Sequence, residues 1–116
     1  MGLKKDFLWG SATASYQCEG AVNEGGRVPS MWDTYLHDGG YETGDVASDF
    51  YHHYKEDIKM MAEGGQNTLR LSLAWPRIIK NIEGEINEEG IEFYRDVLKT
   101  CHHYGITPFV TIYHWD

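Results

Sequence analysis

Three carboxylates and one arginine are the first candidates for chemistry in this sequence. Glu19, Asp33 and Asp116 could act as a general acid and a general base, a role that paired carboxylates often perform. Arg70 lies within a run of strand-forming residues, where an unpaired buried charge is costly. That cost predicts a functional partner for Arg70, which we expect to lie outside residues 1–116.

The histidines and cysteines show no pattern of metal ligands or redox residues. No H-E-x-x-H or C-x-x-C motif occurs, so we expect no metal and no cofactor. Cys18 and Cys101 are interpreted as free thiols in a reducing compartment. Five histidines are expected on the surface or on helix faces, without a catalytic role: His37, His52, His53, His102 and His103.

Composition and charge are those of one soluble domain in 116 residues, of which 41% are hydrophobic. The four Trp, eight Tyr and four Phe supply flat rings that suit core packing or stacking against sugars. The net charge of -8 would repel nucleic acid and anionic membranes, so neither is an expected partner. No secretory leader and no run of about 18 apolar residues occurs, which predicts a cytoplasmic protein.

Two segments have the spacing of apolar residues that is typical of amphipathic helices. The first runs from Val46 to Gly64, with Asp45 as its N-cap. The second runs from about Glu88 to Tyr104, with Asn87 as its cap.

Three short runs, at 7–14, 67–73 and 108–114, have strand character and alternate with these helices. A long glycine-rich loop follows the first run and continues through Gly44. This order predicts an α/β fold with parallel strands joined by right-handed crossovers. Three parallel strands leave both edges of a sheet open, so residues 1–116 are expected to be an incomplete segment of a larger domain.

A series of motifs follows in order from residue 7 to residue 116. Residues 7–21 read Phe-Leu-Trp-Gly-Ser-Ala-Thr-Ala-Ser-Tyr-Gln-Cys-Glu-Gly-Ala. Later motifs include Trp32-Asp33, Tyr54-Lys55-Glu56-Asp57, Arg70 with Ser72, Trp75, Gly84-Glu85-Ile86-Asn87, Gly105-Ile106-Thr107-Pro108 and His114-Trp115-Asp116. Together they resemble glycoside hydrolase family 1, the family of β-glucosidases and 6-phospho-β-glycosidases.

The resemblance implies a TIM (β/α)8 barrel, of which residues 1–116 would be the N-terminal portion, about three strands and the helices between them. It also implies a retaining β-glycosidase that works with two glutamates. In the family one glutamate belongs to an Asn-Glu-Pro motif after the fourth strand and the other to a motif late in the chain. Neither motif occurs here, so we expect no catalytic residue in this chain, and Glu19, Asp33 and Asp116 match structural or hydrogen-bonding positions.

Four residues match positions that the family places near the sugar. Gln17 matches a glutamine at the end of the first strand that hydrogen-bonds sugar hydroxyls, and an amide offers both a donor and an acceptor. His114 matches a histidine at the end of the third strand that contacts the same ring, and Trp115 matches the aromatic residue beside it. Arg70 matches an arginine near the nucleophilic glutamate, where its charge keeps that carboxylate ionised.

The expected substrate is therefore a β-linked sugar, and two questions stay open. Trp115 favours plain β-glucosides, with 6-phospho-β-glucosides or 6-phospho-β-galactosides as the alternative. A hypothesis of another class is a non-catalytic fragment that binds sugar or pairs with the rest of a barrel. In either case the open sheet edges predict the remainder of the barrel, or a second copy of the chain, as the partner.

Overall fold

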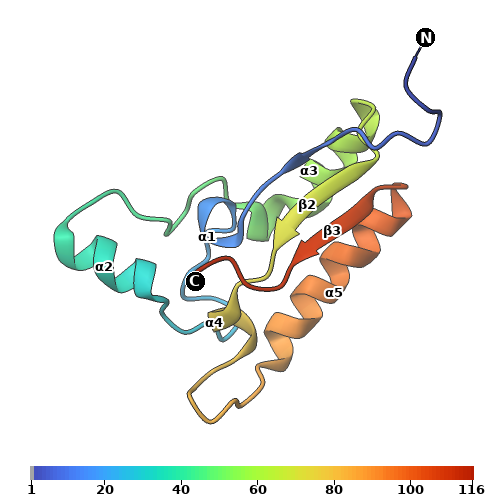
Figure 1. Cartoon of the computed structure of the whole chain (residues 1–116). Helices are drawn as coiled ribbons and strands as arrows, with labels where there is room; N and C mark the ends of the chain where they lie inside the picture. Colours follow the sequence, from blue (N-terminus) through green and yellow to red (C-terminus); the bar gives the residue numbers. More distant parts are fainter. Residues whose placement is uncertain (1) are drawn as a thin grey trace.

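The computed structural model describes residues 2–116 and has a three-stranded parallel sheet at its centre. The strands β1 (Gly10–Ala12), β2 (Thr68–Ser72) and β3 (Thr107–Thr111) lie side by side in that order (Figure 1). Arg70 pairs with Ala12 on one side and with Phe109 on the other. The predicted α/β order and the parallel pairing are confirmed, although β1 is shorter than the run at 7–14.

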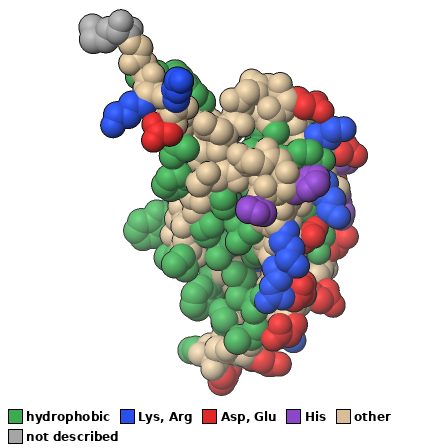
Figure 2. Space-filling view, turned by 90° about the vertical axis from the view of Figure 1, so that its right-hand side faces the viewer, with side chains coloured by type: hydrophobic (Ala, Val, Ile, Leu, Met, Phe, Trp, Pro, Cys, Tyr) green, Lys and Arg blue, Asp and Glu red, His purple; other side chains and the backbone are tan. Residues whose placement is uncertain are grey.

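Two long helices, α3 (Phe50–Glu63) and α5 (Glu88–His103), cover one face of this sheet (Figure 1). Leu69 and Leu71 of β2 point towards them and belong to the buried hydrophobic core. Phe109, in register with Arg70, is 52% exposed because no helix within residues 2–116 covers the opposite face. Figure 2 shows hydrophobic side chains gathered on one side of the molecule and charged side chains on the other.

The helix predicted to begin at Val46 begins at Phe50 instead. Ala47 and Asp49 adopt left-handed backbone angles, with φ of 49° and 54°, which interrupt a right-handed helix. Asp45, the predicted N-cap, therefore lies outside the helix, and Asp49 takes the cap position without a side-chain hydrogen bond to the backbone of the first turn.

The predicted cap of the second helix, Asn87, occupies the N-cap position of α5 but does not cap it with its side chain. Its amide donates instead to the carbonyl oxygens of Gly25 and Arg77, at 2.6 and 2.8 Å. Asn87 therefore joins the long loop to the segment that precedes α5. The helix ends at His103, within one residue of the expected end.

Part of the predicted glycine-rich loop is helical, which corrects the sequence-based expectation. The segment contains a single turn, α1 (Ser15–Cys18), and a longer helix, α2 (Met31–Gly39). The Ser30 side chain accepts a hydrogen bond from the Asp33 backbone, and Gly40 ends α2 in a left-handed conformation. A further short helix, α4 (Trp75–Ile78), follows β2. Within residues 2–116, no helix has the length and apolar character needed to cross a bilayer.

Candidate functional site

Three of the predicted site residues meet at the carboxyl end of the sheet. Gln17 lies in α1, the helical turn after β1, and His114 and Trp115 follow the end of β3. They share a hollow of about 230 Å³. Its lining consists of Ala14, Tyr16, Gln17, Trp32, His114 and Trp115. Parallel strands bring their carboxyl ends to one edge, which explains how residues from both ends of the chain form one surface.

Trp32 of α2 lines this hollow. It belongs to the Trp32-Asp33 motif but was not predicted as a site residue. Its indole Nε1 donates to the carbonyl oxygen of Trp115 at 3.1 Å. Trp115 itself has a left-handed φ of 71° and an exposed side chain. The hydrogen bond thus ties α2 to the segment after β3. Residues 31–39 were expected to form a loop, so the position of Trp32 on a helix beside the hollow could not be predicted.

A hydrogen-bond network connects the segments that carry Gln17 and His114. The Ser15 hydroxyl donates to Asp116 Oδ2 at 2.5 Å, and the Ser15 backbone N–H donates to Ser72 Oγ at 2.7 Å. Ser15 follows β1, Ser72 ends β2 and Asp116 follows β3. The network therefore joins the segments at the carboxyl ends of the three strands. Single serines carry no sequence signal for such a role.

Arg70 lies on the sheet face that α3 and α5 leave uncovered, and it does not line the hollow. One guanidinium nitrogen donates to the carbonyl oxygen of Thr13 at 2.9 Å. Among the described residues Arg70 forms no ion pair. Its positive charge therefore stays available to an acidic group outside this part of the chain.

Glu19 belongs to a buried cluster that lies apart from the hollow. Its Oε1 accepts from Arg77 Nε at 3.0 Å, and its Oε2 accepts from the Tyr94 hydroxyl at 2.6 Å. Burial raises the pKa of Glu19, and the neighbouring Arg77 opposes that rise. Burial and the Glu19 carboxylate together raise the pKa of Tyr94, which keeps its hydroxyl a donor. Both carboxylate oxygens are thus occupied by structural hydrogen bonds.

Asp33 sits in a separate buried ion pair at the start of α2. Its Oδ2 accepts from Arg27 at 2.8 Å and from the Ser30 backbone at 2.7 Å. The two charged side chains are only 3% and 6% exposed, so the pair holds the loop onto α2. Glu19, Asp33 and Asp116 therefore accept hydrogen bonds in three different places rather than facing one another.

The described residues offer no metal centre and no reactive thiol. Among residues 2–116, no three His, Cys, Asp or Glu side chains converge as metal ligands. Cys18 and Cys101 are both free. Burial raises the pKa of Cys18 to about 11 and also raises that of Cys101, so both are protonated near neutral pH and are weak nucleophiles.

His52 links helix α3 to the loop that precedes α2 and is expected to make this contact pH-dependent. Its ring nitrogens lie 2.6 Å from Asp49 Oδ1 and 3.1 Å from Glu24 Oε1. The hydrogen bonds to Asp49 and then to Glu24 raise the pKa of His52. A raised pKa means that the contact stabilises the fold below the unfolded-state pKa and weakens as pH rises through the folded-state value.

The loop at 21–26 should therefore be cleaved more slowly by a protease at about pH 6 than at about pH 8, and limited proteolysis at the two values measures this. In His52→Ala the difference should disappear, whereas it should persist in His102→Ala, an exposed histidine on α5. If the cleavage rates at the two pH values differed equally in both variants, His52 would not be the residue that makes this contact pH-dependent.

Comparison with known proteins adds a family match to this geometry. The model described as Glycosyl hydrolase family 1 matches residues 2–116. A bifunctional β-D-glucosidase/β-D-fucosidase of Bifidobacterium breve is 50% identical over 119 residues, covering 100% of this chain and 26% of the relative. A 6-phospho-β-galactosidase of Clostridium acetobutylicum is 49% identical over 112 residues, covering 97% of this chain and 24% of the relative. The chain thus spans about a quarter of the length of the relatives it matches.

A solved structure also matches this chain over about a quarter of its own length. The crystal structure of a β-glucosidase from Exiguobacterium marinum superposes with a TM-score of 0.92 at 52% identity, covering 100% of this chain and 27% of that one. The solved relatives are TIM barrels, and the sheet described above forms the N-terminal portion of such a barrel. The predicted fold class is therefore confirmed.

Proposed function

Because the chain belongs to glycosyl hydrolase family 1, we propose that the whole protein is a retaining β-glycosidase that acts on β-glucosides. Residues 1–116 then supply part of the sugar-binding site and the N-terminal segment of a single barrel domain. The observation that carries the proposal is the hollow at the carboxyl end of the sheet, which brings Gln17, His114 and Trp115 together. In TIM-barrel enzymes the active site gathers at this end of the strands.

Each residue of the hollow has a chemistry that suits a sugar ring. The exposed Gln17 amide can donate to one hydroxyl group and accept from its neighbour. His114 offers one ring nitrogen as a donor or acceptor, and the exposed indole of Trp115 provides an apolar surface for the C–H face of the ring. These groups bind and orient the sugar. They do not transfer protons to it.

Arg70 is proposed as a positioning residue for catalysis. Two glutamates about 5 Å apart carry out retaining cleavage, one as acid and base and the other as nucleophile. Both are expected outside residues 1–116. The unpaired guanidinium of Arg70, on the uncovered sheet face, would keep the nucleophilic carboxylate ionised by favouring its charged form.

A 6-phospho-β-glycosidase is the second candidate, because the Clostridium acetobutylicum relative of that activity is nearly as similar to this chain as the Bifidobacterium breve one. The described hollow contains no lysine or arginine that would pair with a sugar phosphate. In such an enzyme, residues outside 1–116 would bind the phosphate. A cytoplasmic location is proposed for either enzyme, on the support of two free cysteines.

The protein encoded by the complete reading frame is expected to hydrolyse nitrophenyl β-glucoside with retention of anomeric configuration. Initial rates with the glucoside, the galactoside and their 6-phosphates identify the preferred class, and proton NMR of the first product identifies the anomer. Residues 1–116 alone serve as the control and should show no turnover. Turnover by this segment that depends on Glu19 or Asp116 would overturn the assignment of the catalytic carboxylates, and an inverted product would overturn the mechanism.

A further inference from the structure

The segment that follows β3 carries two residues of the hollow but forms neither helix nor strand. His114 and Trp115 of this segment line the hollow at the carboxyl end of the sheet. Trp115 has a φ of 71°, in the left-handed region that a residue with a bulky side chain rarely adopts. Such a conformation persists only where the surrounding structure holds it. Contacts on both sides of Trp115 are therefore needed to keep it.

The chain is held before Trp115 by the pairing of β3 with β2, and after it by two hydrogen bonds. The Trp32 indole donates to the Trp115 carbonyl oxygen at 3.1 Å, and the Ser15 hydroxyl donates to Asp116 Oδ2 at 2.5 Å. Within residues 2–116, no other hydrogen bond reaches the segment after β3. The side chain of Asp116 therefore supplies one of the two anchors.

The hydroxyl of Ser15 is directed at Asp116 by a second buried serine. Ser15 and Ser72 are each 2% exposed, and Ser72 Oγ accepts from the Ser15 backbone N–H at 2.7 Å. The Ser72 hydroxyl donates to Ser15 Oγ at 3.2 Å, so the Ser15 proton is left to point at the carboxylate. Asp116 Oδ1 is buried and has no hydrogen-bond partner within residues 2–116. Ser15 is thus the contact that orients this carboxylate in the described part of the chain.

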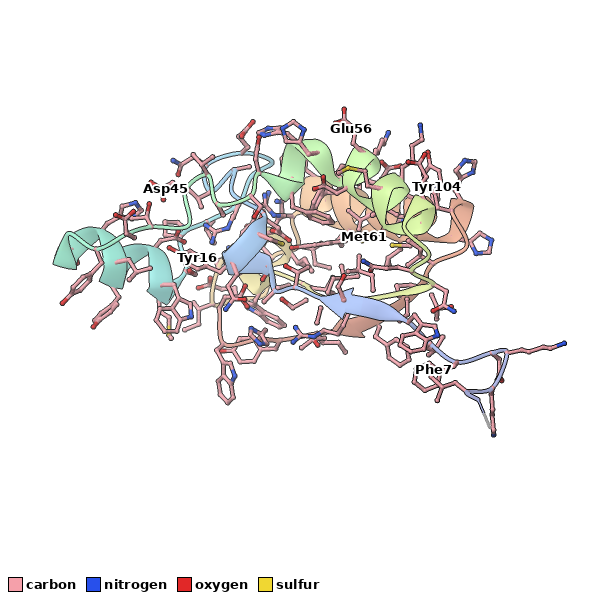
Figure 3. All side chains as sticks on the ribbon, turned by 90° about the horizontal axis from the view of Figure 1, so that it is seen from above. Phe7, Tyr16, Asp45, Glu56, Met61 and Tyr104 are labelled. Atoms are coloured by element: carbon pink, nitrogen blue, oxygen red, sulfur yellow. The ribbon has the colours of Figure 1, made fainter. Side chains whose placement is uncertain are left out.

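The same hydrogen bond connects the segment after β3 to the turn that carries Gln17. Ser15 is the first residue of α1, two positions before Gln17. In Figure 3, Tyr16, which lies between these two residues, is found at the carboxyl end of β1, and Phe7 lies beyond the other end. The bond between Ser15 and Asp116 therefore joins the two parts of the chain that meet in the hollow.

The φ angle of Trp115 sets the direction of its indole relative to His114, because rotation about the N–Cα bond moves the Trp115 side chain and all that follows it. We propose that Asp116 is a positioning residue of the sugar site: by accepting from Ser15 it keeps Trp115 left-handed and holds His114 and Trp115 together in the lining of the hollow. Asp116 does not itself line the hollow. The inference rests on the proposed function for the assignment of a sugar to that hollow.

Asp116→Ala in the full-length protein should lower kcat/KM for nitrophenyl β-glucoside about 10- to 100-fold, since a misplacement of about 1 Å in a binding group has an effect of this order. Most of the loss should fall on kcat, because contacts to the sugar are strongest in the transition state. Asp116→Asn keeps an oxygen that accepts from Ser15 and should retain most of the wild-type kcat/KM. A loss in Asp116→Asn as large as that in Asp116→Ala would overturn the inference.

Asp96→Ala is the matched control. It removes a carboxylate that accepts a hydrogen bond from the Tyr54 hydroxyl and so joins α5 to α3, away from the hollow. It should lower the melting temperature and keep the wild-type kcat/KM. A loss of kcat/KM in Asp96→Ala equal to that in Asp116→Ala would overturn the inference, because the effect would then be one of general destabilisation.

Combining Asp116→Ala with His114→Ala separates positioning from an independent effect. Residues that act through one another give losses that are not additive in free energy. The double variant should therefore lose less kcat/KM than the product of the two single losses. Losses that multiply in full would show that Asp116 does not act through the segment that contains His114.

A crystal structure of full-length Asp116→Ala tests the inference without a measurement of activity. The φ of residue 115 should leave the left-handed region once the anchor is removed. A retained left-handed φ would overturn the inference and leave the glycosidase assignment intact. Failure of the wild-type protein to hydrolyse any glucoside would instead overturn the proposed function, and the crystal structure would still decide whether Asp116 holds Trp115.

Discussion

Replacing Arg77 with methionine is expected to lower the free energy of unfolding by about 3–5 kcal/mol, because it leaves the buried Glu19 carboxylate without its counter-charge. Arg77 has no exposed surface, and its guanidinium also donates to the carbonyl oxygens of Gly20 and Glu24. The guanidinium carbon Cζ of Arg77 lies 4.6 Å from the centre of the Tyr51 ring. One side chain therefore joins the long loop, α4 and the aromatic core.

Urea unfolding of the full-length protein measures this effect, with Arg95→Met as the matched control. Arg95 pairs with Glu92 on the exposed face of α5, where loss of an ion pair costs at most about 1 kcal/mol. Adding Glu19→Gln to Arg77→Met should restore part of the loss, since the buried charge is then removed. A loss in Arg77→Met no larger than in Arg95→Met would show that Glu19 is not stabilised by this pair.

The same variant has a predicted pH dependence. Burial already raises the pKa of Glu19, and removal of Arg77 takes away the main opposing charge, so the folded-state pKa rises further. A carboxyl with a raised folded-state pKa stabilises the fold more as pH falls. The difference in free energy of unfolding between wild type and Arg77→Met should therefore be smaller at low pH, and urea unfolding at several pH values measures it.

The sheet and its two long helices could be predicted because they depend on local hydrophobic patterns. The start of α3 could not, since it depends on contacts with a distant segment. Tyr51 donates its backbone N–H to the Glu19 carbonyl oxygen at 3.0 Å. A Cβ at Gly20 would lie 2.2 Å from the Val46 carbonyl oxygen. These contacts hold residues 46–49 in a turn where the apolar spacing alone favours a helix.

The helix α2 was missed for a different reason, because its signals are short and surrounded by glycines. Ser30 and Asp33 have the spacing of a capping box, which marks the start of a helix, and Gly39-Gly40 marks its end. The sequence therefore contains signals for both ends of α2. Gln17 and His114 were identified through the family motifs, but their convergence on one hollow required the register of the parallel sheet.

Gln17→Ala and His114→Ala in the full-length protein are each expected to lower kcat/KM for nitrophenyl β-glucoside by about 2–4 kcal/mol of transition-state stabilisation, which is roughly 30- to 1000-fold. Hydrogen bonds to ring hydroxyls strengthen as the ring distorts and charge develops, so their loss affects the chemical step more than ground-state binding. Gln17 is exposed and His114 is only half-buried, so neither truncation removes a buried contact. The melting temperature should therefore change little.

Gln66→Ala and His102→Ala are the matched controls, because they change the same residue types elsewhere on the molecule. Gln66 accepts a hydrogen bond from Ser11 near the start of the sheet, and His102 lies exposed near the end of α5. Both should retain wild-type kinetics. If Gln17→Ala and His114→Ala kept normal kcat/KM but lost several degrees of melting temperature, both residues would be structural, and the hollow would lose its assignment as the sugar site.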